Sequence, residues 1–460
     1  MDKNAKFVQV KKELNAKSPS MCLAKWMQVT IHLQNGMTHS CHHPVSHKVP
    51  LRELEANPSA LHNTKFKKFQ RKMMLEGTRP KECDYCWRIE DANPDNYSDR
   101  VYKSADDWAY PHMEKVKSLS GDENINPSYV EVSFGNECHF KCAYCSPAVS
   151  SAILSEYQKF GHYEALPYLD LSLLKSTKQY PYLKDEFNPY VDAFWKWWPS
   201  LKNDLEVFRI TGGEPLLNPN TFQFLEAIVK EPLPKLDLAI NSNLCVPDSA
   251  IRKFTELSRR IVEGKMVQKY EIYTSLDTFG DQAEYIRFGL DMDKFLKNVK
   301  YILDNVPDVK IVFMCTFNAL SVPGFEKFLK MMKELKLQYK MTEYTSRIGL
   351  SISYLRYPTF MAANILPAEF IVYVEKALNY MLRNSMEESG FEVFSEFEVS
   401  QLRRIIEWLK HNDLQDHQRS ALQKQFLNFF IEYDRRKETS FSDTFPEFNE
   451  FMNQLKISAS

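Results

Sequence analysis

Glycine is scarce in this chain, which has only 13 among 460 residues. Wherever glycines cluster, the backbone itself therefore needs their freedom. Long apolar runs are also missing, so no segment reaches the roughly 20 residues of a membrane-spanning helix. The formal net charge of −1 gives no reason to expect nucleic acid or an anionic membrane as a partner. The first twenty residues are charged and lack an apolar stretch, which argues against a secretory signal.

The nine cysteines are an odd number in a chain with no apparent export signal. This favours reduced thiols and metal ligation over a disulfide framework, and it predicts a cytoplasmic location. Hydrophobic content of 44% and charged content of 26% are ordinary for a globular protein. The length accommodates a barrel of about 200–250 residues with one or two smaller units.

Three thiols lie close together on one loop, at Cys138, Cys142 and Cys145, directly after a strand-like stretch at 129–135. Three cysteines can converge on one metal centre but cannot supply a full tetrahedral set. A cubane cluster held by three thiolates keeps one iron open to a small ligand, whereas electron-transfer clusters normally have four cysteines. The alternatives are a zinc knuckle or three unrelated buried thiols.

The adjacent glycines Gly212 and Gly213 stand at the end of a predicted strand and are followed by Glu214 and Pro215. Backbone carbonyls and a carboxylate are acceptors that suit a cationic ammonium group, whereas a phosphate would need donors. The alternative is an ordinary strand-to-helix turn.

A second set of thiols lies near the N-terminus, where Cys83 and Cys86 form a Cys-x-x-Cys pair and join Cys22 and Cys41. Zinc and a [4Fe–4S] cluster both accept four thiolates, so spacing alone leaves the two open. Residues 26–41 read as a β-hairpin around an Asn-Gly turn. In such a hairpin Cys22 sits well down the strand from Cys41, so the chain before residue 26 must double back for both to ligate one centre.

From residue 125 to 365, strands and amphipathic helices alternate, which predicts parallel pairing with right-handed crossovers. The expected strands are 129–135, 206–211, 235–241, 269–276, 308–316 and 350–355. Six such units would form a partial (β/α)6 barrel with its chemistry at the C-terminal strand ends. An aromatic-rich stretch at about 150–203 reads as a helical insertion, and 366–460 reads as a helical extension without any metal or phosphate motif.

The Cys-x3-Cys-x2-Cys loop with Tyr144 before its third thiol, followed by Gly-Gly-Glu-Pro at the next strand end, resembles the radical S-adenosylmethionine (SAM) superfamily. The resemblance implies an α/β partial barrel, a [4Fe–4S] cluster on the three cysteines, and SAM chelated by the open iron. It implies that Gly212, Gly213 and Glu214 receive the SAM amino group. Further expected SAM contacts are Tyr144, Asn243, Ser275 and Arg287, the last as a bidentate partner of the SAM carboxylate or else as a surface arginine.

The N-terminal pattern of cysteines resembles the twitch-type auxiliary-cluster module, here placed before the barrel as in the N-terminal twitch radical SAM proteins. This resemblance implies an auxiliary [4Fe–4S] cluster on Cys22, Cys41, Cys83 and Cys86, which would accept an electron or ligate substrate. The expected organisation is a mobile arm at 1–20, the twitch-like α+β module at 21–110, the barrel at 125–365 and the C-terminal helices at 366–460.

The expected reaction is reductive cleavage of SAM to a 5′-deoxyadenosyl radical, with electrons from an external reductant such as flavodoxin or ferredoxin. A peptide or protein is the first expected substrate, and a carbohydrate or nucleotide-linked small molecule is the alternative. A non-enzymatic zinc or iron–sulfur protein is the competing hypothesis from another class.

Overall fold

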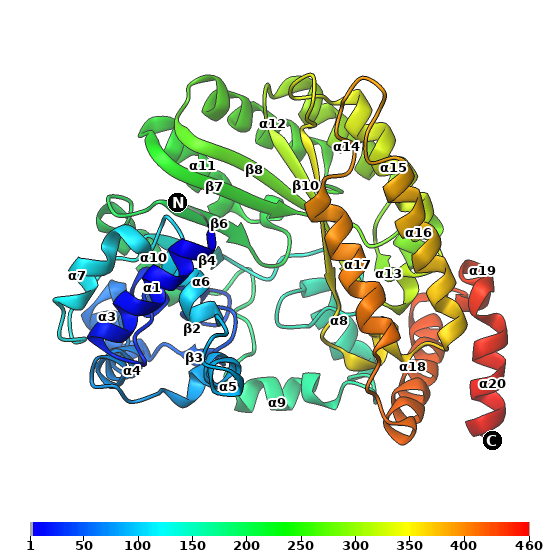
Figure 1. The fold of residues 1–460 in the computed structure, drawn as a ribbon, viewed down its shortest axis with the longest axis horizontal. Helices are drawn as coiled ribbons and strands as arrows, with labels where there is room; N and C mark the ends of the chain where they lie inside the picture. Colours follow the sequence, from blue (N-terminus) through cyan, green and yellow to red (C-terminus); the bar gives the residue numbers. More distant parts are fainter. Residues whose placement is uncertain (1–2, 460) are drawn as a thin grey trace.

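The structure is a computed structural model that describes residues 3–459. Its described residues contain one large sheet of nine strands, in the order β11-β10-β8-β7-β6-β4-β1-β2-β3 (Figure 1). The strands are β1 Gln28–His32, β2 Met37–His39, β3 His47–Lys48, β4 Tyr129–Ser133, β6 Val207–Thr211, β7 Leu233–Ser242, β8 Val267–Ser275, β10 Lys310–Phe317 and β11 Ile348–Tyr354.

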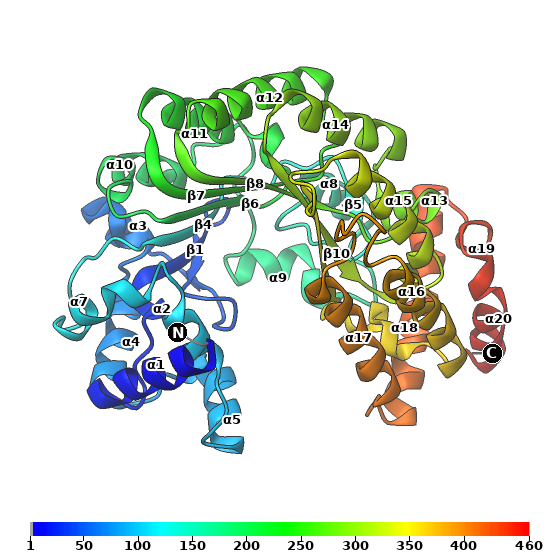
Figure 2. The same ribbon diagram turned by 45° about the horizontal axis from the view of Figure 1, so that its top comes forward.

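Six neighbouring strands, β4, β6, β7, β8, β10 and β11, pair in parallel, which confirms the predicted partial barrel. Helices between them cover one face of the sheet, as Figure 2 shows for α11, α12 and α14. The barrel helices are α11 Pro219–Lys230, α12 Asp248–Glu263, α13 Asp281–Ile286, α14 Met292–Asn305 and α15 Phe325–Gln338. In α12 the buried residues Ile251, Phe254 and Ile261 recur at helical spacing, so one stripe packs on the sheet.

The N-terminal hairpin β1–β2 forms as predicted, with Thr30 opposite His39. Strand β1 also pairs in parallel with β4, with Gln28 beside Tyr129, so the N-terminal region shares the sheet of the barrel. This pairing was not predicted. Around the hairpin lie α2 Ala24–Met27, α3 Leu51–Ala56, α4 Lys65–Leu75, α5 Asp84–Ala92, α6 Asp99–Ala105 and α7 Met113–Lys117.

The expected mobile arm is wrong over the described part of residues 1–20. Residues Lys3–Lys17 form helix α1, which packs on α6. Its Val10 and Leu14 are fully buried in a core shared with Trp26 and Trp87. Phe7 of the same helix also packs against this core, so an apolar stripe docks a helix that is otherwise mostly polar.

The stretch at 150–203 contains α8 Ser151–Phe160, α9 Leu171–Ser176 and α10 Pro189–Leu201. Phe194, Trp197 and Trp198 of α10 are buried, so these aromatics belong to the core.

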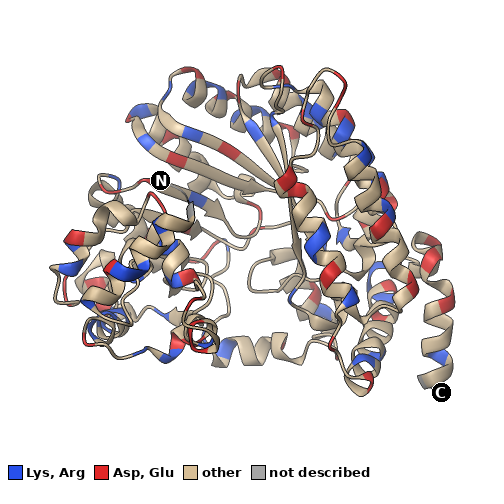
Figure 3. Ribbon diagram, in the orientation of Figure 1, with Lys and Arg blue, Asp and Glu red and all other residues tan. Residues whose placement is uncertain are grey.

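The C-terminal part contains α16 Ile371–Arg383, α17 Glu396–Lys410, α18 Asp416–Lys437, α19 Phe441–Thr444 and α20 Asn449–Ala459. Acidic and basic residues are interspersed over the whole ribbon (Figure 3). No helix among the described residues has both the length and the apolar character to cross a membrane.

Helix α17 covers the outer edge of the barrel sheet, strand β11. The backbone N–H of Leu350 donates to Glu398 Oε1 at 2.8 Å, and that of Ile352 donates to Gln401 Oε1 at 2.9 Å. Glu398 is also paired with the buried Lys336 at 2.7 Å. An exposed strand edge would offer unpaired backbone groups to other chains, so these side chains satisfy two backbone N–H groups of the last barrel strand.

We expect Gln401→Leu to destabilise the protein by about 1–3 kcal/mol, because it leaves the buried N–H of Ile352 without an acceptor. Urea unfolding measures the loss. The matched control is Arg404→Ala on the exposed side of the same helix, which should change stability little. Equal stability of Gln401→Leu and the parent protein would contradict the role given to this edge contact.

Candidate functional site

The cysteine loop lies at the C-terminal ends of the barrel strands and lines a cavity of about 230 Å³. The structure gathers there nine of the ten residues predicted for the SAM site. They are Cys138, Cys142, Tyr144, Cys145, Gly212, Gly213, Asn243, Ser275 and Arg287. The cavity is also lined by Thr211, Asn241 and Thr316, which come from the ends of β6, β7 and β10.

The glycine pair Gly212 and Gly213 is required because the chain approaches neighbouring atoms too closely there to leave room for a side chain. A side chain on Gly212 would place its Cβ 2.2 Å from Ser133 Oγ, at a φ of +117°. A Cβ on Gly213 would lie 2.5 Å from the carbonyl oxygen of Glu137, next to Cys138. The Gly-Gly turn therefore packs directly against the backbone of the cysteine loop, and only glycine fits.

Glu214, the tenth predicted residue, lies behind the cavity wall and is 1% exposed. Its carboxylate accepts hydrogen bonds from the Asn243 N–H at 2.6 Å, Ser242 Oγ at 2.7 Å and the Leu216 N–H at 3.0 Å. Burial raises the pKa of Glu214 to about 7 despite these bonds. In this structure Glu214 ties the ends of β6 and β7 together, and its contact with SAM stays a prediction.

Arg287 is fully engaged by the protein itself. Its Nε donates to Asp277 Oδ2 at 2.9 Å and its Nη2 donates to Asp277 Oδ1 at 3.1 Å. The Tyr144 hydroxyl donates to Asp277 at 2.7 Å and accepts a hydrogen bond from Arg287. The remaining nitrogen, Nη1, lies 4.0 Å from Cys142 Sγ. The prediction that Arg287 is a surface residue is wrong, and its contact with the SAM carboxylate stays a prediction.

The cysteine loop is held from a second direction by a short antiparallel pair of strands. Strand β5, Lys141–Cys142, pairs with β9, Arg287–Phe288, and the Ala143 N–H donates to the Ile286 carbonyl at 2.8 Å.

Burial raises the pKa of all three thiols of the loop, to about 12 for Cys142. Neutral thiols are poor ligands, so a bound cation or cluster would have to stabilise the thiolates.

The four N-terminal cysteines also meet at one place. Cys22, Cys41, Cys83 and Cys86 line a single cavity. Cys22 reaches this cavity because the short helix α2 turns the chain between Cys22 and β1, and its role as a ligand stays a prediction. Burial raises the pKa of Cys83 and of Cys86 to about 11.

The histidines near Cys41 have other partners. His43 lines the N-terminal cavity, and its ring stacks on that of Tyr85 with 3.7 Å between the ring centroids. Its Nε2 lies 2.7 Å from Asp99 Oδ2. His47 contacts Thr64 Oγ1 at 2.9 Å. Across the described residues, no three His, Cys, Asp or Glu side chains converge closely enough to hold one metal ion.

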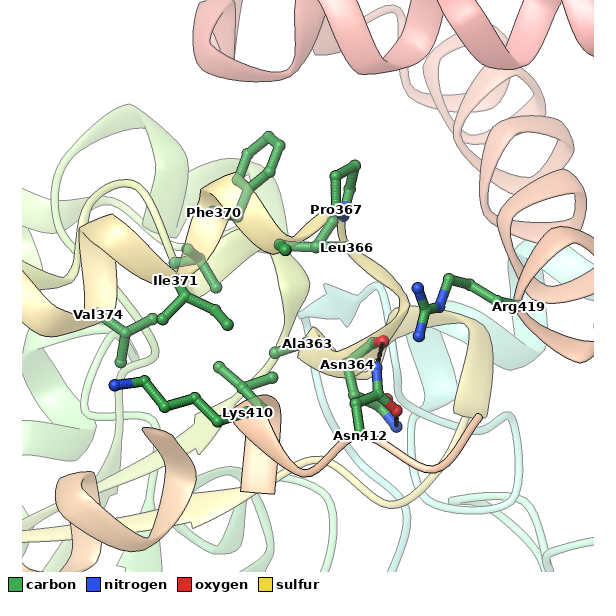
Figure 4. Close-up of a pocket in the computed structure, with 13 residues that line it drawn as sticks. Ala363, Asn364, Leu366, Pro367, Phe370, Ile371, Val374, Lys410, Asn412 and Arg419 are labelled. Atoms are coloured by element: carbon green, nitrogen blue, oxygen red, sulfur yellow. Dashed lines mark hydrogen bonds between the residues drawn. The ribbon is translucent and has the colours of Figure 1, made fainter. Parts of the chain in front are cut away.

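Another cavity, of about 310 Å³, lies between α16, α17 and the start of α18. Figure 4 shows its apolar side at Leu366, Ile371 and Val374, and its polar end at Asn364, Asn412 and Arg419. None of the residues predicted for either cysteine site lines it.

Sequence reasoning missed Asp277 as a site residue. It is 0% exposed, and besides Arg287 and Tyr144 it accepts the Thr316 N–H at 2.8 Å. The available signal was the Ser275-Leu-Asp277 run at a strand end, from which only Ser275 was named as an expected SAM contact.

Comparison with known proteins agrees with this geometry. The family described as "Radical SAM superfamily" matches residues 132–332. GTP 3′,8-cyclase of Campylobacter lari is 22% identical over 221 residues, covering 47% of this chain and 55% of that protein. GTP 3′,8-cyclase of Trichodesmium erythraeum is 31% identical over 117 residues, covering 25% of this chain and 27% of that protein. The chain thus spans about half or less of these relatives.

Among solved structures, Streptococcus suis SuiB bound to S-adenosylmethionine is similar at a TM-score of 0.37 and 13% identity. The match covers 79% of this chain and 71% of SuiB. SuiB bound to the precursor peptide SuiA is similar at a TM-score of 0.36 and 14% identity, covering 79% and 70%.

We expect Arg287→Met to destabilise the protein by about 3–5 kcal/mol, because it leaves Asp277 charged and buried without its cationic partner. The double variant Arg287→Met/Asp277→Asn should lose less than Arg287→Met alone. Anaerobic thermal unfolding measures both. Arg259→Met, which removes an exposed pair with Glu256, is the control and should change the melting temperature little.

Proposed function

We propose that this protein is a radical SAM enzyme that reductively cleaves SAM to abstract hydrogen from its substrate, because residues 132–332 match the radical SAM superfamily. A [4Fe–4S] cluster on Cys138, Cys142 and Cys145 would supply one electron to SAM, and the resulting 5′-deoxyadenosyl radical would take a hydrogen atom from substrate. The observation that carries this proposal is one cavity that unites three thiols, the Gly-Gly turn and the strand-end polar residues.

The protein's own residues would position these groups. Gly212 and Gly213 bring carbonyl groups beside the cysteine loop, because no side chain separates the two backbones. Asn243, whose N–H is fixed by Glu214, and Ser275 offer polar groups at the same rim. Arg287 and Tyr144, both bonded to Asp277, fix the side of the loop that carries Cys142.

We propose a second, auxiliary [4Fe–4S] cluster on Cys22, Cys41, Cys83 and Cys86. Zinc would require four sulfurs about 2.3 Å from one ion. A cubane offers a different iron to each cysteine, so its ligands surround a larger volume. The four cysteines that line one cavity would supply the four thiolates that such a cluster takes. With four thiolates the auxiliary cluster would be full, which favours electron transfer over substrate ligation.

A peptide or protein is the first proposed substrate, and the observation that favours it is the likeness to SuiB, a structure of which is bound to a precursor peptide. A nucleotide-linked small molecule is the second candidate, favoured by the relatives named GTP 3′,8-cyclase. An external one-electron reductant would supply the electron for the cleavage of SAM.

Anaerobic reconstitution and iron counting test both cluster assignments. We expect about eight iron atoms per chain, and about four after Cys138→Ala or Cys83→Ala. Cys138→Ala should abolish formation of 5′-deoxyadenosine from SAM, because the cluster that binds SAM is lost. Cys83→Ala should spare it. About four iron atoms with bound zinc in the parent protein would reject the auxiliary cluster alone. Absence of 5′-deoxyadenosine with a strong reductant would reject the enzymatic proposal.

A further inference from the structure

The cavity between α16, α17 and α18 is separate from both cysteine sites and has an apolar side and a polar end (Figure 4). Its volume of about 310 Å³ is at the lower end of the range of small-ligand sites. Leu366, Ile371, Val374 and Leu409 form the apolar side. Such a wall suits a branched aliphatic group, because burying that group removes apolar surface from water.

Arg419 is the cation at the polar end, and the protein leaves its charge without a partner. Its guanidinium points from α18 toward Asn364 (Figure 4). The Nε atom is buried and makes no hydrogen bond, and the side chain forms no ion pair among residues 3–459. The other lining cation, Lys410, is already paired with Glu375 at 2.6 Å. A buried donor without an acceptor costs free energy, so a carboxylate placed here would gain a charged hydrogen bond.

An acceptor belongs to the same end of the cavity. Asn412 Nδ2 donates to the Asn364 carbonyl at 2.5 Å, and Asn364 Nδ2 donates to Asn412 Oδ1 at 3.4 Å. These bonds leave Asn364 Oδ1 without a donor among the described residues. A ligand with a carboxylate and an adjacent N–H would therefore match Arg419 and Asn364 together.

The charges around the cavity distinguish between ligands of this kind. No aspartate or glutamate is among its lining residues. The ammonium of a free amino acid would therefore lie near Arg419 without a counter-ion. A peptide N–H is neutral and still donates a hydrogen bond, whereas a fatty acid has no N–H for Asn364. The C-terminal residue of a peptide fits this combination best.

The cavity lies at the same end of the barrel strands as the cysteine loop. Thr316, at the end of β10, lines the SAM-site cavity, and Val322, which follows the same strand, lines this one. In α/β barrels ligands bind at the C-terminal ends of the strands. A peptide held in this cavity would thus lie at the end of the barrel where the substrate is expected.

We propose that this cavity binds the C-terminal residue of the peptide substrate. Its α-carboxylate would pair with Arg419, its N–H would donate to Asn364 Oδ1, and its side chain would pack on Leu366, Ile371 and Val374. The inference rests on the peptide substrate proposed above. It narrows that substrate to a peptide that ends in a free carboxylate and an aliphatic residue.

Titration of N-acetyl-leucine into the reconstituted full-length chain, followed by NMR of the ligand methyl groups, tests the site. N-acetyl-leucinamide should bind about tenfold more weakly, because it loses the charged hydrogen bond. Leucine adds an unpaired ammonium and 4-methylvalerate lacks the N–H, so both should also bind more weakly. Equal binding of leucine or of 4-methylvalerate would overturn the peptide assignment in favour of a free amino acid or a fatty acid.

Arg419→Gln should weaken the binding of N-acetyl-leucine about tenfold and remove its advantage over the amide. The variant should stay folded, because the Arg419 side chain makes no hydrogen bond or ion pair that would be lost. Arg404→Gln, on the exposed side of α17, is the matched control and should bind as the parent does. Absence of binding, or equal binding by Arg419→Gln, would overturn this inference. Because binding is measured without SAM or reductant, formation of 5′-deoxyadenosine tests the enzymatic proposal separately.

Discussion

The buried carboxylate of Asp277 is the contact on which the candidate active site depends. It binds Arg287 of β9, Tyr144 of the cysteine loop and the backbone of β10 at the same time. These segments are far apart in the sequence, and Asp277 joins them at one place. Because Asp277 is wholly buried, it is stable only with this full set of partners. The position of Cys142 therefore depends on a largely buried charge pair between Asp277 and Arg287.

The barrel was largely predictable from the sequence, because strand-like stretches alternate with amphipathic helices along the chain. What could not be predicted was the parallel pairing of β1 with β4, since Gln28 and Tyr129 meet across a hundred residues and no local pattern specifies that register. Helix α1 was missed for a related reason. Its sequence is mostly charged, and the burial of Val10 and Leu14 depends on the neighbouring α6, which the local sequence does not reveal.

The candidate site shows the same division between local and distant information. Short spacings predicted the three-thiol loop and the Gly-Gly turn, because ligands on one loop and glycines at one turn are set by adjacent residues. The partners of Arg287 depend on how β9 docks on β5, so its bonds to Asp277 and Tyr144 emerge only in three dimensions. Cys22 was doubtful because hairpin geometry separates it from Cys41, and the turn of α2 brings it to the cavity.

The C-terminal helices carry no sequence motif, yet α18 is linked by buried contacts to the segments that hold the cysteine loop. Lys437 of α18 pairs with the buried Glu156 of α8 at 3.0 Å, and Lys141, beside Cys142, lies 3.3 Å from the same carboxylate. Tyr285, just before β9, donates its hydroxyl to Asp434 of α18 at 2.7 Å. Both strands that hold the cysteine loop are thus connected to α18. The extension contributes to the site through these buried bonds, which explains why a functional role leaves no metal or phosphate signature in its sequence.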